Sequence, residues 1–240
     1  MVSDHPIIAT LVAAAVALQI AVFTTTIYLH RAAAHKALVM RPSVAFLYRL
    51  GVWLTTGIVP REWVAVHRKH HAFTDEAGDP HSPRLEGFWR VQLGNVFYYL
   101  REAHNEDTVE KYAKDMPPDV WDRLFFNRGN IGLLAGTGIL CLAVGIVPGI
   151  AAMVLHGFLY VFVLSSSING LCHVYGYKNF DNTAGNIRSL ALITGGEGLH
   201  NNHHGRPGSA RLSVRASEFD PAWAVIRTMS LLGLARLKGV

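Results

Sequence analysis

Two long stretches without a charged residue constrain this chain more than any other feature. Residues 7–29 contain no Asp, Glu, Lys or Arg, and neither do residues 131–169. A helix rises 1.5 Å per residue, so about 20 apolar residues cross the roughly 30 Å of bilayer hydrocarbon. Only 16% of the chain is charged, against about 25% in a typical soluble domain. The sequence therefore predicts an all-α integral membrane protein.

The second uncharged stretch is too long for one span. Pro148-Gly149 is a turn signal inside it, which predicts two spans, at 131–148 and 149–169. The first stretch predicts a span at 7–29. A third apolar segment, 44–59, is short and carries Arg49, which favours an interfacial helix over a span. We expect one membrane domain over residues 1–240, with about three transmembrane helices.

The basic residues predict the orientation. All 22 Lys and Arg residues fall within 31–128 or 178–240, and basic loops lie on the cytoplasmic side. We therefore expect 30–128 and 170–240 to form a cytoplasmic helical cap, with the N-terminus outside. The net charge of +5 then indicates a surface facing anionic lipid, and no nucleic-acid partner. A cleaved signal peptide is disfavoured for 7–29, because no basic segment precedes it.

The chain has 13 histidines, and nine of them fall in four groups. The nine are His30, His35, His67, His70, His71, His173, His200, His203 and His204. Two groups read HxxHH, and helical offsets of three and four predict that each directs three imidazoles to one point. His30 and His35 are five residues apart, which predicts either two different metal ions or a distorted helix. The charge assignment places all nine at the cytoplasmic side.

Nine neutral imidazoles are too many for one metal ion. Zinc takes four ligands, and imidazole also suits iron, copper and nickel, so the ligand type does not choose the metal. The count favours two ions with four or five nitrogens each and open positions for oxygen or water. The other four histidines, His5, His81, His104 and His156, are interpreted as structural or surface residues. His156 lies mid-membrane, where it could hydrogen-bond a neighbouring helix.

The order HxxxxH, HxxHH, HxxHH resembles the three histidine boxes of the membrane-bound fatty acid desaturase family. Further matches are EW before the second box, DPH after it, NxxxHxxGY from Asn169 and EGLHNNHH from Glu197. The likeness covers about residues 20–230. The third box opens with His200 and continues HNNHHxxPxSAR, which is similar to the stearoyl-CoA type of Δ9 desaturase and its bacterial branch.

The resemblance implies a histidine-rich dimetal site of two non-haem irons, held by the nine histidines, with Asn169 acting through water. It implies O2-dependent removal of two hydrogens from a long-chain fatty acyl substrate held in an apolar tunnel, giving a cis double bond near Δ9. Electrons would come from a separate ferredoxin-, rubredoxin- or cytochrome b5-like donor, since no haem domain is fused. The implied location is a bacterial inner membrane.

Around the boxes we expect two further sets of residues. The carboxylates Glu197, Asp75 and Asp79 are candidates to orient ligand imidazoles, with surface carboxylates as the alternative for the two aspartates. The cations that flank the boxes are candidates to meet an anionic headgroup or carrier, or alternatively anionic lipid. These cations are Arg61, Arg68, Lys69 and Arg206.

The chain departs from the family pattern in two places. Most members have two spans before the first box, and here there is room for one. Arg215-Ala216 stands where the bacterial branch often has paired tryptophans. Two alternatives remain for the function: a hydroxylase or decarboxylase on the same scaffold, and a non-catalytic membrane protein that binds or transports metal. Transport is disfavoured because residues 131–169 offer few polar groups along the spans.

Overall fold

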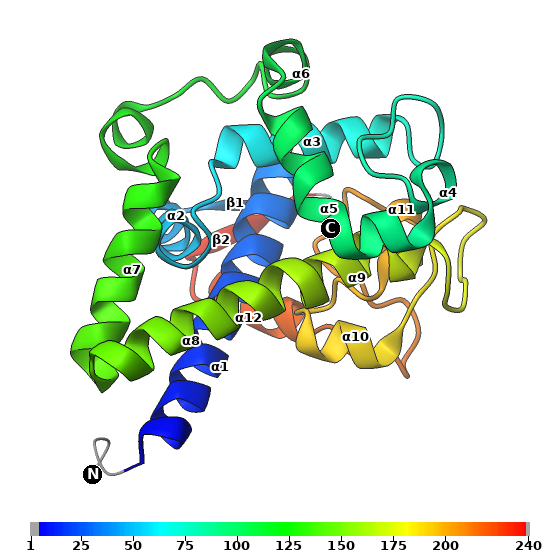
Figure 1. Ribbon diagram of the computed structural model, residues 1–240. Helices are drawn as coiled ribbons and strands as arrows, with labels where there is room; N and C mark the ends of the chain where they lie inside the picture. The colour runs from blue at the N-terminus through cyan, green and yellow to red at the C-terminus, as the bar shows by residue number, and fades with distance from the viewer. Residues whose placement is uncertain (1–4, 239–240) are drawn as a thin grey trace.

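The computed structural model describes residues 5–238 and is almost entirely helical, as predicted (Figure 1). Its described strands, β1 (Leu38–Met40) and β2 (Ala235–Leu237), form one small antiparallel pair. Two helices, Pro6–Ala34 and Ile146–His173, are long and apolar enough to cross a membrane. The protein is therefore an integral membrane protein.

The first long helix consists of α1 (Pro6–Thr24) and the π-helix η1 (Thr25–Ala34), which follows it without a break. Pro6 stands in the first turn of α1, where its missing N–H leaves no hydrogen bond unmade. Ala14 and Ala17 are buried, while Val12 and Val16 are exposed. The small residues let neighbouring helices approach closely, and the branched residues form the outer surface.

The segment expected as an interfacial helix forms α2 (Pro42–Thr56), and α3 (Pro60–Ala72) follows after a bend of 87°. The bend lies at Gly57, whose φ of 63° is left-handed and suits glycine. By length and composition α2 passes as a membrane span only together with α3. His156 donates from Nε2 to the carbonyl of Thr55 at the end of α2, over 2.7 Å, as expected of a histidine that bonds a neighbouring helix.

The second uncharged stretch forms a helical hairpin, but its turn is not where the sequence predicted. The first arm, α7, spans Gly129–Val144, and α8 begins at Ile146. The chain turns at Gly145, with φ of 96°, and the expected turn at Pro148-Gly149 is wrong. Pro148 lies in the first turn of α8, where a proline needs no N–H partner. From α8 (Ile146–Phe158) the helix continues through η3 (Leu159–Ser165), α9 (Ser166–Asn169) and η4 (Leu171–His173).

Glycines on α7 allow it to touch the backbone of α2. A Cβ added at Gly132 would lie 2.2 Å from the carbonyl oxygen of Trp53, and one at Gly136 would lie 2.1 Å from that of Leu54. The Trp53 indole N–H donates to the carbonyl of Arg128 over 2.9 Å. Helix α2 is therefore packed directly between α1 and α7.

The remaining helices surround the long ones, and α3, α5, α6 and α11 are grouped as a cap beyond the end of α1 (Figure 1). These remaining helices are α4 (Pro83–Glu86), α5 (Phe88–Ala103), α6 (Glu106–Tyr112), η2 (Asp122–Phe126), α10 (Arg188–Ile193), α11 (His200–Gly205) and α12 (Pro221–Leu231). A buried ion pair joins η1 to the segment before α12: both Arg31 terminal nitrogens lie 3.0 Å from Asp220 oxygens. This pair fixes the end of the first long helix to the cap.

Candidate metal centre

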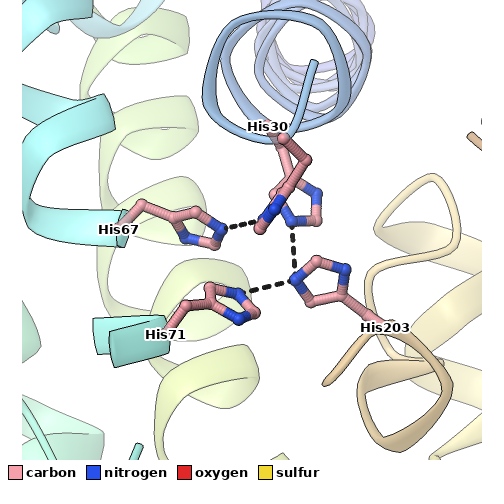
Figure 2. A group of neighbouring side chains, drawn as sticks. His30, His67, His71 and His203 are labelled. Carbon is pink, nitrogen blue, oxygen red and sulfur yellow. Dashed lines mark hydrogen bonds between the residues drawn. The ribbon is translucent and has the colours of Figure 1, made fainter. Parts of the chain in front are cut away.

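The nine histidines of the sequence motifs meet in two adjacent groups inside the cap. The first group is His30, His35, His67, His71 and His203, and the second is His70, His173, His200 and His204. Within each group the candidate ligand nitrogens all lie within 4.8 Å of one another. Figure 2 shows members of the first group converging from η1, α3 and α11. The division into five and four matches the number of donors expected for each of two ions.

Each HxxHH box divides between the two groups. His67 and His71 of α3 enter the first group, and His70 between them enters the second. In the third box the middle histidine, His203, enters the first group and the outer pair enters the second. The prediction that each box directs three imidazoles to one point is therefore wrong. Residues i and i+4 lie about 40° apart on a helix, whereas i+3 lies about 60° to the other side.

The π-helical turn explains how His30 and His35 reach the same group. The backbone N–H of His35 bonds to the carbonyl of His30, five residues earlier, over 3.1 Å. Hydrogen bonds from i+5 to i widen the helix, so residues five apart return to one face. The two residues lie in one group, and the distorted helix is the correct alternative.

Three buried carboxylates each contact the Nδ1 atom of a different histidine. Glu197 Oε1 lies 2.7 Å from His30. On the second group, Asp79 lies 3.0 Å from His70, and Asp75 lies 3.0 Å from His173. Glu197 and Asp79 are buried residues, and the Asp75 side chain is 1% exposed, so neither aspartate is a surface carboxylate.

These contacts leave the other ring nitrogen of each histidine without a proton. His30 Nδ1 must donate to Glu197, so its Nε2 presents a lone pair, and it faces His203 Nε2 at 3.0 Å. His203 Nε2 also lies 2.8 Å from His71 Nε2, and one proton cannot serve both contacts. His70 Nε2 is buried and makes no hydrogen bond within the described chain. Converging lone pairs of this kind fit a bound cation, so the residues present fit a pair of metal ions.

Burial keeps the histidines in the form that a metal requires. Desolvation, with the nearby His30 and Arg68, lowers the pKa of His35 to about 2. The pKa values of His200 and His203 are also held well below the usual range, first by burial and then by neighbouring histidines. A neutral imidazole is the ligand form, so these nitrogens are available to a metal at neutral pH.

The carboxylates have the opposite charge state. Burial alone raises the pKa of Glu197, but the hydrogen bond from His30 and the nearby Arg31 guanidinium outweigh it and hold the pKa below its usual value. The Asp79 pKa is lowered in the same way, with His70 outweighing burial. Both groups are ionised at neutral pH, and their charge favours a proton on Nδ1 of each partner histidine.

A cavity of about 830 Å³ is lined by histidines of both groups and by residues of the long helices. His30, His67, His70 and His200 line one part of it. The rest of the wall is mostly apolar or aromatic and includes Val22, Val66, Val96, Leu133, Met153, Tyr160, Val161, Leu164 and Ile168. The cavity therefore gives an apolar chain direct access to both histidine groups.

Asn169 lines the same cavity, and its side chain donates to Asn95 Oδ1 over 3.2 Å. Its proposed action on a metal through water stays a prediction. His81, interpreted from sequence as structural or surface, is buried and stacks on His70 with ring centroids 4.7 Å apart. Sequence reasoning gave no role to Arg31, although it directly follows a box histidine and anchors this end of η1 through Asp220.

Two of the four expected headgroup cations are engaged within the protein. Arg68 binds Asp115 and the carbonyls of η1 residues, and Lys69 lies 2.6 Å from Glu102. Arg206 lies over the Phe180 ring at 5.2 Å. The Nε of Arg61 is buried and makes no hydrogen bond to the described residues. Contact of these four cations with a headgroup stays a prediction, and Arg68 and Lys69 already serve to hold the cap together.

Comparison with known proteins agrees with the geometry. A family model described as fatty acid desaturase matches residues 8–234. The chain is 30% identical over 214 residues to an sn-1 stearoyl-lipid 9-desaturase of Synechocystis sp., covering 88% of this chain and 65% of that one. It is 32% identical to an acyl-CoA 5-desaturase of Anemone leveillei (89% and 66%) and 33% identical to an sn-2 palmitoyl-lipid 9-desaturase of Nostoc sp. (86% and 73%). The chain spans slightly less than two thirds of the length of the first two relatives.

Proposed function

Because the chain belongs to the fatty acid desaturase family, we propose that it is an O2-dependent desaturase that inserts a cis double bond, near Δ9, into a long fatty acyl chain. The observation that carries this proposal is the largely apolar cavity that is lined by histidines of both groups. A metal-storage or transport protein has no need of a large apolar cavity at its metal site. A desaturase needs one, because its substrate is an alkyl chain.

We propose that the two groups hold two iron ions. The five nitrogens of the first group would bind one ion, and the four of the second, with Asn169 through water, would bind the other. When bound, the irons would supply the oxidising power from O2 that removal of hydrogen from an unactivated methylene requires. The nature of the metal is itself part of the proposal, since imidazole also suits copper, nickel and zinc.

The protein's own residues would position the ligand imidazoles and the acyl chain, and would keep water away from the centre. Glu197, Asp75 and Asp79 fix the tautomer and the orientation of three ligand imidazoles. The apolar wall would hold the acyl chain with one methylene pair beside the centre and exclude water. Tyr160, whose hydroxyl lies 2.7 Å from Thr25 Oγ1, adds a fixed polar pair to this wall near η1.

The proposed partners and the proposed location follow from membership of the family and from the charge distribution. The acyl group and a separate ferredoxin-, rubredoxin- or cytochrome b5-like electron donor are the proposed partners. The basic segments favour a cytoplasmic position for the centre in a bacterial inner membrane, with the N-terminus outside.

The test is metal analysis followed by product analysis. Protein purified in detergent after iron-replete expression should contain two irons per chain. Cells that express it should accumulate acyl chains lighter by two hydrogens, whereas chains heavier by one oxygen would indicate a hydroxylase. Protein that holds zinc, or no metal, and gives neither product would refute the proposed activity.

A further inference from the structure

Helix α5 exposes a continuous stripe of large apolar side chains. Trp89, Leu93, Phe97 and Leu100 are 69%, 61%, 69% and 42% exposed. At 100° per residue these positions fall within an arc of about 80°. Such a stripe on a helix of the cap must face something less polar than water.

The opposite face of α5 packs on the end of the second long helix. Asn95 donates to the Ser165 hydroxyl over 3.4 Å and accepts from Asn169 over 3.2 Å. Phe158 and Phe162, earlier in the same long helix, are 55% and 36% exposed. Helix α5 therefore packs against η3 and α9 of a long helix that also exposes large apolar side chains, and its own apolar stripe points away from that contact.

The charges on α5 suit the surface of a bilayer. Arg90 and Arg101 are exposed and lie about 60–80° from the centre of the stripe, both on the same edge. Arginine stems can lie along apolar surface while their guanidinium groups reach phosphates. Trp89 is the residue type enriched at membrane–water interfaces. One long edge of the helix is therefore basic, and the stripe beside it is apolar.

The same helix is a wall of the cavity. Asn95, Val96, Tyr99 and Leu100 all line it. Leu100 thus belongs both to the exposed stripe and to the cavity wall, and His104, which follows α5, is also exposed and lines the cavity. The cavity therefore opens beside the stripe, at the C-terminal end of α5.

We propose that α5 lies in the membrane interface and that the cavity opens to the leaflet between Leu100 and His104, so that it takes the acyl chain of a membrane lipid. The reaction of the chain inside the cavity rests on the proposed function, but its route into the cavity does not. A chain that enters here passes from apolar leaflet to apolar cavity without exposing its methylenes to water. The chain of an acyl thioester on a soluble carrier would instead have to reach the opening from the aqueous side.

The position of α5 can be measured with nitroxide labels in proteoliposomes. Labels at Leu93→Cys and Phe97→Cys should be accessible to oxygen and protected from an aqueous nickel chelate. The lipid reference is Leu142→Cys on α7, where the residue is 90% exposed, and the water reference is Glu110→Cys on α6. All variants carry Cys141→Ala to remove the half-buried native thiol. Labels at 93 and 97 that behave like the label at 110 would place the stripe in water or against a soluble protein, and would overturn the proposal.

The route is tested with a phosphatidylcholine that carries a photoreactive diazirine within its acyl chain. Leu100→Trp should reduce labelling of the cavity residues several-fold, whereas the matched change Leu93→Trp, on the outer stripe, should leave it unchanged. Equal labelling in both variants would refute entry at Leu100, and so would cavity labelling by a diazirine acyl-CoA but not by the lipid. Neither measurement requires turnover. An inactive protein that still takes up the lipid would refute the proposed function and leave the route standing.

Discussion

Replacement of Glu197 by glutamine should weaken the binding of one of the two proposed metal ions and leave the binding of the other unchanged. The carboxylate lies 2.7 Å from His30 Nδ1 and is buried. A hydrogen bond to a charged group contributes about 1.5–3 kcal/mol and a neutral one about 1 kcal/mol, so Glu197→Gln should lose roughly 0.5–2 kcal/mol. Every 1.4 kcal/mol is about tenfold in affinity. The expected loss of affinity is therefore about 2–30-fold, and its upper part overlaps the 10–100-fold typical of such partners.

The assay is the rate at which a chelator removes iron from the detergent-solubilised protein. Wild type should release both irons slowly, and Glu197→Gln should release one of them several times faster. Asp79→Asn, which affects His70 in the second group, should accelerate loss of the other iron, so that the double variant loses both. Asp115→Asn is the matched control, because Asp115 pairs with Arg68 and Lys36 and contacts no histidine of either group. Wild-type release from Glu197→Gln, or equal acceleration of both irons, would show that Glu197 does not act through His30.

Three further outcomes follow from the described contacts. Asp220→Asn leaves its buried arginine without a charged partner and should lower the free energy of unfolding by about 3–5 kcal/mol, measured by thermal unfolding in detergent. Gly132→Ala should lower the unfolding temperature because its Cβ would meet the carbonyl of Trp53, whereas Gly138→Ala, with open space around it, should not; equal melting would contradict this packing. Buried histidines such as His35 have folded pKa values far below 6.5, so the unfolded chain binds more protons below that pH. The metal-free protein should therefore lose about 1.4 kcal/mol for each such histidine between pH 7.5 and 5.5, and unchanged melting over this range would refute it.

Much of the candidate metal centre could be predicted from the sequence, because helix geometry relates spacing to direction. The boxes predicted which histidines meet, and the acidic residues near them predicted the three carboxylate partners. What spacing could not predict was the division of each box. Whether His70 joins His67 or turns away depends on its partners in the second group, and these come from chain segments more than a hundred residues away.

Backbone features account for the other differences. The local sequence is compatible with the π-helix at His30 and the turn at Gly145, but it does not require either conformation. Pro148 marks a break equally well as a turn residue or as a first-turn residue of a helix. The apolar stripe of α5 was not predicted, because the orientation was inferred from Lys and Arg alone. Arg90 and Arg101 therefore assigned this helix to the cytoplasmic cap.

The contacts within the centre also predict how the protein responds to loss of its metal. Several lone pairs face one another at about 3 Å in both groups, which is unfavourable without a cation. The elements that carry them are nevertheless held by other contacts, including the Arg31–Asp220 ion pair and the helix packing around α1. Metal removal should therefore leave the helical content intact and lower the unfolding temperature. A metal present at 100 times its dissociation constant stabilises by about 2.7 kcal/mol. Circular dichroism before and after chelation measures both effects. Loss of most helical signal on chelation, as in small zinc domains that fold only with metal, would show that the centre organises the fold rather than depending on it.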